Sequence, residues 1–200
     1  SRDMAAGGLG APLSPFAHFL LFHDKKDSRI VHNIGGISNL TFLPKEGMID
    51  NVIAFDTGPG NMLIDGLVSH LSHGKKQFDE GGKWAKKGEI NNDLLSFMMN
   101  HPFIKKPPPK ATGREEFGDI FLHNILSKAE KHKIPDNDLV TTVTAFTAES
   151  IVSNYKEHIF KIDLPSDIIF CGGGIHNQFL MGLLKKKLPE FIISTTEKHG

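Results

Sequence analysis

The residues with the clearest chemical potential lie in the segment VIAFDTGPGNMLIDG, residues 52–66. Asp56 follows an apolar run typical of a buried strand, and the glycine-rich residues after it lead into a segment with helical periodicity. A carboxylate at the carboxyl end of a strand lies in the usual ligand crevice of an α/β sheet. There it could take a proton from a hydroxyl or water, or hold a magnesium ion. Capping of the turn by its side chain is an equal alternative.

Two further glycine turns suggest a ligand held between several loops. Gly172, Gly173 and Gly174 separate a strand-like run from a helical segment, and AAGGLGAPL at 5–13 follows Asp3. Such turns let backbone amides approach phosphate, although tight strand–helix packing is the better explanation of a lone glycine triplet. None of the turns is a complete GxGxxG, and the absence of GxxxxGK[ST] excludes a P-loop NTPase. Actin-like ATP-binding folds hold phosphates between several such loops.

Other candidate residues have simpler explanations. His70 and His73 are spaced as a metal pair on one helix face, but no third ligand is evident and solvated histidines are favoured. Cys171 could be a nucleophile, but a small buried residue is the commoner role. In KKPPPKATGREEF, Arg114 could clamp an anionic group. The same segment has three lysines that could lie near such a group or could simply be solvated at the surface: Lys105, Lys106 and Lys110.

The hydrophobic pattern predicts the elements that position these residues. Two strands broken at Gly35-Gly36 are expected over 28–44, and Asn61 is expected to cap a helix over 61–73. Further strands are expected at 51–56, at 191–194 and at the start of 167–177. The other expected helices are 78–87, 91–100, 118–132, 138–160 and 178–188. Residues 14–23 are expected to form a short helix or a buried connection. Three prolines interrupt the chain at 107–109. The order of elements predicts an α/β domain with a mixed sheet flanked by helices.

Composition narrows the class of protein. The chain has 200 residues, 39% hydrophobic and 23% charged, with a formal net charge of zero and one cysteine. The balanced charge gives no sign of a nucleic-acid or anionic-membrane partner. The single cysteine excludes an internal disulfide framework, and no apolar run reaches the length of a membrane helix. A cytoplasmic globular protein is therefore expected.

Four separated stretches resemble the motifs of the anhydro-N-acetylmuramic acid kinase family. They are RDMAAGGLGAPLSPF, NIGGISNLTFLP with FDTGPGNMLID, KPPPKATGREEF and CGGGIHNQFLM. The family belongs to the sugar kinase, heat-shock ATPase and actin superfamily, so the resemblance implies an actin-like ATPase (ribonuclease H-like) fold. It also implies that residues 1–27 end an N-terminal domain and inter-domain segment, and that residues 28–200 form most of a C-terminal ATPase-type domain.

The resemblance further implies a reaction and its residues. Such enzymes use ATP and Mg²⁺ to open the 1,6-anhydro ring of a cell-wall sugar and phosphorylate its 6-oxygen during peptidoglycan recycling. Asp56 matches the catalytic aspartate that activates water, Arg2 and Asp3 match a pair lining the sugar cleft, and a homodimer is implied. No residue is assigned to a metal. The residues implied at the nucleotide are Gly35, Gly36, Gly58, Gly60, Asn61, Gly172, Gly173 and Gly174.

The chain also departs from the family pattern. Leu9 stands where the family usually has glutamine, and no GxMSGTSxDGxD phosphate loop is present. A final family segment with a sugar-holding glutamate is also missing. We therefore expect a fragment lacking both ends, whose 200 residues alone have little or no kinase activity. The alternatives are a kinase for levoglucosan-type anhydrohexoses and a truncated nucleotide-binding module without catalysis.

Overall fold

The computed structural model describes residues 13–198, and a five-stranded mixed sheet forms its centre. The strands lie in the order β3-β2-β1-β4-β5. β2 is antiparallel to both β1 and β3, whereas β4 is parallel to both β1 and β5. The sheet confirms the predicted α/β class. Its strands are β1 (Arg29–Ile34), β2 (Ile37–Leu43), β3 (Ile53–Pro59), β4 (Asp167–Cys171) and β5 (Ile192–Thr195).

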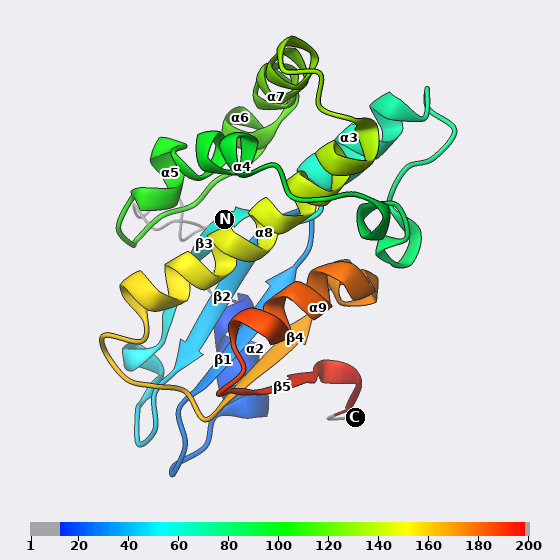
Figure 1. The fold of residues 1–200 in the computed structure, drawn as a ribbon. Helices are drawn as coiled ribbons and strands as arrows, with labels where there is room; N and C mark the ends of the chain where they lie inside the picture. Colours follow the sequence, from blue (N-terminus) through cyan, green and yellow to red (C-terminus); the bar gives the residue numbers. More distant parts are fainter. Residues whose placement is uncertain (1–12, 199–200) are drawn as a thin grey trace.

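Eight α-helices are present in the described part of the chain (Figure 1). They are α2 (Leu13–Phe22), α3 (Met62–Leu71), α4 (Asn92–Met99), α5 (Pro102–Lys105), α6 (Arg114–Phe117), α7 (Asp119–Lys131), α8 (Asp136–His158) and α9 (Gln178–Lys187). Short 3₁₀ turns are η1 (Ile49–Asn51), η2 (Glu80–Gly82), η3 (Ala85–Lys87), η4 (Gly173–His176) and η5 (Thr196–Lys198).

The helix expected over 78–87 is wrong, because η2 and η3 replace it. Gly81 and Gly82 have φ values of 64° and 71°. Left-handed residues cannot continue a right-handed helix, so the chain turns twice in this segment.

The long helix α8 lies between the sheet and the outer helices (Figure 1). It contributes residues to two hydrophobic cores. Its first half packs with α3, α4 and α7 through residues such as Val143 and Phe146. Its second half packs on the sheet beside α9 through residues such as Ile151 and Tyr155. Because the helix is covered on several sides, its four threonines and Ser150 are buried as well as its apolar residues. α8 therefore reaches from the sheet to the outer helices.

The helix α2 contacts β1 and β2. His18 Nδ1 and Thr41 Oγ1 lie 2.8 Å apart, joining the helix to β2 by a hydrogen bond. In Figure 1, α2 lies behind the sheet, opposite α8 and α9. The sheet therefore has helices on both faces, as expected for this class.

Candidate active site

Asp56 lies within β3, which corrects the expectation that it ends the strand. The strand continues three residues beyond Asp56. Asp56 faces Asn39 on β2, and pairing resumes with Gly58 opposite Ser38. The extra residue, Thr57, makes a β-bulge, and its hydroxyl donates to the Ser38 carbonyl oxygen at 3.1 Å. Sequence patterning missed this extension because TGP reads as a turn.

The Asp56 carboxylate is held by the segment that follows the three prolines. Its Oδ2 accepts the backbone N–H of Thr112 at 2.8 Å, and its own N–H donates to the Lys110 carbonyl oxygen at 3.1 Å. Oδ1 has no hydrogen-bond partner among residues 13–198. Burial raises the pKa of Asp56, with Glu115 adding to the increase, while the Thr112 bond and Lys110 oppose it. One fixed oxygen, one available oxygen and a raised pKa suit a group that takes up a proton.

Lys110 is buried, with only 2% of its surface exposed, which rules out the solvated alternative. Its ammonium donates to the carbonyl oxygens of Phe103 and Ile104 at 3.2 and 3.3 Å. Burial lowers the pKa of Lys110 to about 8, the charge of Lys106 adds to this, and Asp56 opposes it. The other candidates of this segment, Lys105, Lys106 and Arg114, are exposed.

The two glycine turns beside Asp56 form one hydrogen-bonded unit. The N–H groups of Gly60 and Met62 donate to the Gly36 carbonyl oxygen at 2.9 and 3.1 Å, and the Asn61 N–H donates to Gly35 O at 2.8 Å. A Cβ at Gly60 would lie 2.2 Å from Gly35 O, so the close approach requires glycine. Gly35-Gly36 therefore closes the β1–β2 hairpin and also supports the turn after β3.

Asn61 precedes α3, but its side chain does not cap the helix. Its Nδ2 instead donates to Ile34 O at 3.3 Å, so Asn61 occupies the expected N-cap position without the side-chain cap bond. The neighbouring β1 strand competes for this side chain. Asn61 thereby links the start of α3 to the end of β1.

In the glycine triplet after β4, two residues are required by close packing and the third is exposed. A Cβ at Gly172, where φ is 82°, would lie 2.4 Å from Asn33 Oδ1. At Gly174 it would lie 2.3 Å from Ile34 Cγ2. Gly173 is exposed, and its nearest such contact is Asn61 Nδ2 at 3.9 Å. Tight packing thus explains Gly172 and Gly174, whereas Gly173 leaves its backbone accessible.

A cavity of about 330 Å³ opens where the turns after β3 and β4 meet. Burial raises the pKa of Asp65, on its wall, to about 6. The sequence indicated Asn61 and Gly173 but missed Asp65, whose signal was its position one helical turn after Asn61. The cavity is lined by Asn61, Ile64, Asp65, Phe78, Asp79, Glu80, Gly81, Gly173, His176 and Asn177.

Buried polar residues of α8 bind the bulge of β3 and the turn that follows the strand. Thr147 Oγ1 donates to Gly60 O at 2.9 Å, and Asn154 Nδ2 donates to Thr57 O at 3.0 Å. Sequence analysis missed both residues. The available signal was the helical spacing of polar positions within an otherwise buried helix.

The remaining candidates are less favourable for chemistry. His70 and His73 are exposed, and residues 13–198 contain no group of three or more His, Cys, Asp or Glu residues able to hold a metal. Cys171 is half-buried, and burial raises the pKa of its thiol, which disfavours the reactive thiolate. Arg2 and Asp3 lie outside the described residues. No helix within 13–198 is long and apolar enough to cross a membrane.

The chain is similar to solved structures of the same fold. It aligns with the activator of the 2-hydroxyisocaproyl-CoA dehydratase from Clostridium difficile at a TM-score of 0.54 and 16% identity. The alignment covers 91% of this chain and 59% of that chain. This likeness supports the predicted actin-like ATPase fold.

Sequence comparison identifies curated relatives. The chain is 45% identical over 199 residues to the anhydro-N-acetylmuramic acid kinase of Caldanaerobacter subterraneus subsp. tengcongensis, covering 100% of the chain and 50% of the relative. It is 46% identical over 198 residues to that of Clostridioides difficile, covering 99% and 51%. The chain thus spans about half the length of these relatives.

The profile of one family, described as anhydro-N-acetylmuramic acid kinase, matches residues 1–200. The matched range includes Asp56 and the glycine turns at 35–36, 58–60 and 172–174. The chain therefore belongs to the anhydro-N-acetylmuramic acid kinase family.

Proposed function

We propose that a protein carrying this chain is an ATP-dependent kinase that opens the 1,6-anhydro ring of anhydro-N-acetylmuramic acid and phosphorylates its 6-oxygen. The observation that carries the proposal is the Asp56 carboxylate, fixed by Thr112 beside the paired glycine turns. Family membership supports the reaction. Because the chain spans about half the length of its relatives, we assign the activity to a protein of their full length. The 200 residues alone are expected to have little or no activity.

In this mechanism Asp56 is the general base. Thr112 holds one carboxylate oxygen, and the other is available to a water molecule. Asp56 takes a proton from that water as the water oxygen bonds to the anomeric carbon. The bond from that carbon to the bridging 6-oxygen breaks, and the 6-oxygen accepts the γ-phosphoryl group of ATP. The products are N-acetylmuramic acid 6-phosphate and ADP.

We place the nucleotide along the turns after β3 and β4. The amides of Gly60 and Asn61 are engaged with the Gly35-Gly36 turn, so their role is to shape the site. The exposed backbone of Gly173 and the 330 Å³ cavity offer room for the nucleoside. The activator of similar fold was solved with bound ADPNP, which supports a nucleotide in this fold. The backbone beside the nucleotide would then follow the close turns that require Gly58, Gly172 and Gly174.

Holding Mg²⁺ is the alternative role for the same Asp56 oxygen, which cannot bind a metal ion and take the proton of the water at the same time. Magnesium prefers oxygen ligands and commonly uses one or two carboxylates together with substrate phosphates. The available Oδ1 of Asp56 is such a donor. Mg²⁺ would neutralise negative charge on the phosphates during transfer.

The test is an assay of a protein of the relatives' full length with Mg·ATP and anhydro-N-acetylmuramic acid in ¹⁸O-labelled water. We expect a product that has gained one water and one phosphoryl group, with the label at the anomeric carbon. Absence of turnover, or label in the phosphate, would contradict the proposal. Levoglucosan serves as a second substrate. Turnover of levoglucosan alone would instead support the anhydrohexose kinase.

A further inference from the structure

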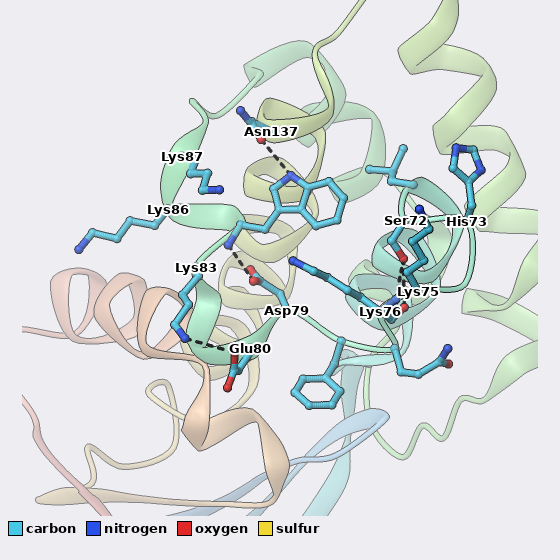
Figure 2. Close-up of a pocket in the computed structure, with 14 residues that line it drawn as sticks. Ser72, His73, Lys75, Lys76, Asp79, Glu80, Lys83, Lys86, Lys87 and Asn137 are labelled. Carbon is cyan, nitrogen blue, oxygen red and sulfur yellow. Dashed lines mark hydrogen bonds and ion pairs between the residues drawn. The ribbon is translucent and has the colours of Figure 1, made fainter.

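A second cavity, of about 1240 Å³, lies beyond the end of α3 (Figure 2). Its residues come mainly from the segment 71–87, with Asn137 from α8. Phe78, Asp79 and Glu80 line both this cavity and the smaller one beside Gly173. The two cavities therefore share a wall. We refer to the larger one as the lysine cavity.

The backbone that builds the lysine cavity is held by specific bonds. After α3, His73 and Gly74 have φ values of 50° and 76° and reverse the chain. Lys76 N–H then donates to Ser72 Oγ at 2.9 Å, and Gly74 N–H donates to Ser69 O at 2.8 Å. The reversal brings two lysines, 75 and 76, onto the cavity rim.

The opposite wall is fixed by Asp79, which is buried. Its two carboxylate oxygens accept the N–H groups of Trp84 and Ala85 at 2.7 and 2.9 Å. The indole N–H of Trp84 donates to Asn137 Oδ1 at 2.9 Å, so the ring is held at both ends. Lys76 Nζ lies 5.6 Å from the centroid of this ring. The wall therefore has an ordered aromatic surface.

The cavity has a surplus of positive charge. It is lined by Lys75, Lys76, Lys83, Lys86 and Lys87 against two carboxylates, Asp79 and Glu80. Asp79 is occupied by backbone amides, and Glu80 pairs with Lys83 at 3.2 Å. The other four lysines have no carboxylate partner among residues 13–198. Because the whole chain has no net charge, this concentration of lysines is local.

The lysine side chains of the cavity differ in whether they point toward it. Figure 2 shows Lys76 and Lys87 pointing toward the cavity, whereas Lys86 points away from it. Lysine ammonium groups bind phosphate as point charges, and several around a concave surface favour a ligand with more than one phosphate. Phe78, 59% exposed, adds an apolar surface beside them.

We propose that the lysine cavity binds a small ligand carrying an oligophosphate group. The ammonium groups of Lys75, Lys76 and Lys87 hold the phosphates, and Trp84 and Phe78 provide the apolar side of the site. The ligand chemistry is shared by inorganic oligophosphates and by nucleotides. A concave site of limited extent favours a small anion over a nucleic acid, which requires an extended basic stripe. The proposal does not depend on the kinase assignment.

Trp84, the only tryptophan in the sequence, provides the readout. The 200-residue chain is titrated with inorganic tripolyphosphate, and in a second arm with ADP, while tryptophan fluorescence is followed. We expect saturable quenching that weakens as salt is raised. In Lys76→Gln/Lys87→Gln the affinity should fall at least about tenfold, because two charges that point at the ligand are gone. Circular dichroism confirms that each variant remains folded.

The matched control is Lys185→Gln/Lys186→Gln, which removes the same charge from exposed positions of α9. It should bind as the unmodified chain does. Equal weakening in both variants would show a diffuse charge effect and overturn the proposal, as would the absence of saturation with either probe.

Tighter binding of ADP than of tripolyphosphate, lost in the Lys76/Lys87 variant, would identify a nucleotide as the source. Equal affinities would identify an inorganic oligophosphate. Saturation by single-stranded DNA at lower concentration than by either probe would contradict the small-ligand assignment.

Discussion

At Asp56 and Lys110, a carboxyl and an ammonium group share a site in which burial disfavours the charge of each. The Lys110 charge lowers the pKa of Asp56, and the Asp56 charge raises that of Lys110. The lysine backbone also accepts the Asp56 N–H. Lys110 therefore acts on Asp56 both through its charge and through the position of its loop.

Replacing Lys110 with methionine should separate these effects. We expect Lys110→Met to raise the pKa of the Asp56 carboxyl, because a nearby positive charge is removed. It should also lower the free energy of unfolding by about 1–3 kcal/mol, because the carbonyls of Phe103 and Ile104 lose their donor. NMR titration of the Asp56 carboxyl carbon and urea denaturation measure the two changes.

The exposed Lys106→Met is the control for Lys110→Met. It should leave stability nearly unchanged. An unchanged Asp56 pKa in Lys110→Met would show that the two charges do not interact.

Asp65 provides a second test at the residue scale. Burial raises its pKa from 3.8 to about 6, so the folded protein holds the proton more tightly than the unfolded chain. Its ionisation therefore costs stability as the pH rises from about 4 to above 6. We expect Asp65→Asn to add about 1 kcal/mol to the free energy of unfolding at pH 8, a value reduced for partial solvent screening. Urea denaturation at pH 3.5 should show no gain, and equal gains at both pH values would refute the cause given.

At the scale of elements, the paired glycine turns fix how β1, β2 and β3 meet α3. Gly60→Ala should destabilise the chain by about 1–3 kcal/mol, because the new Cβ would lie 2.2 Å from the Gly35 carbonyl oxygen. Gly36→Ala, where nothing lies within 4 Å of the new Cβ, is the matched control and should be close to neutral. Denaturant midpoints of the two variants provide the comparison. Similar losses in both would contradict the role of the close approach.

The sequence predicted helices and strands correctly where the local hydrophobic pattern determines the structure. The apolar runs of β1, β2 and β4 and the periodic segments of α7 and α9 were predicted because their own side chains determine burial. The extension of β3 depends on pairing with β2, and the turns η2 and η3 depend on two consecutive left-handed glycines. Such features arise from tertiary contacts that periodicity does not contain.

The candidate site was predictable to a similar degree. Motif spacing brought attention to Asp56 and the glycines, and the structure places Asn61 near Gly173. Lys110 could not be identified as buried, because its sequence neighbours are prolines and lysines typical of an exposed loop. Thr147 and Asn154 were hidden in a helix whose polar positions normally face solvent.

At the scale of the whole molecule, a buried polar chain joins the sheet to α8. Thr57 Oγ1 donates to Ser38 Oγ at 2.9 Å, and Ser38 Oγ lies 2.6 Å from His32 Nε2. His32 Nδ1 lies 2.7 Å from the Tyr155 hydroxyl. Burial lowers the pKa of His32 to about 3, so the ring is neutral in the folded protein.

This histidine makes the fold sensitive to acid. The unfolded chain takes a proton on His32 near pH 6.5, whereas the folded protein does so only near pH 3. Stability is therefore lost as the pH falls below about 6.5, by about 2 kcal/mol between pH 7 and pH 5. Urea denaturation of the chain and of His32→Gln at both pH values tests this. The variant should be less stable at pH 7 but should lose less on acidification, and an equal loss in both proteins would exclude His32 as the cause.

The central claim is that Asp56 acts as the base of a sugar kinase. Its most direct test is steady-state kinetics of Asp56→Asn in a protein of the relatives' full length, with the exposed Glu190→Gln as control. We expect kcat to fall about 10²–10⁴-fold in Asp56→Asn while the affinity for ATP changes little, because asparagine has the size of aspartate but cannot take the proton. A kcat within about twofold of the unmodified enzyme would contradict the claim.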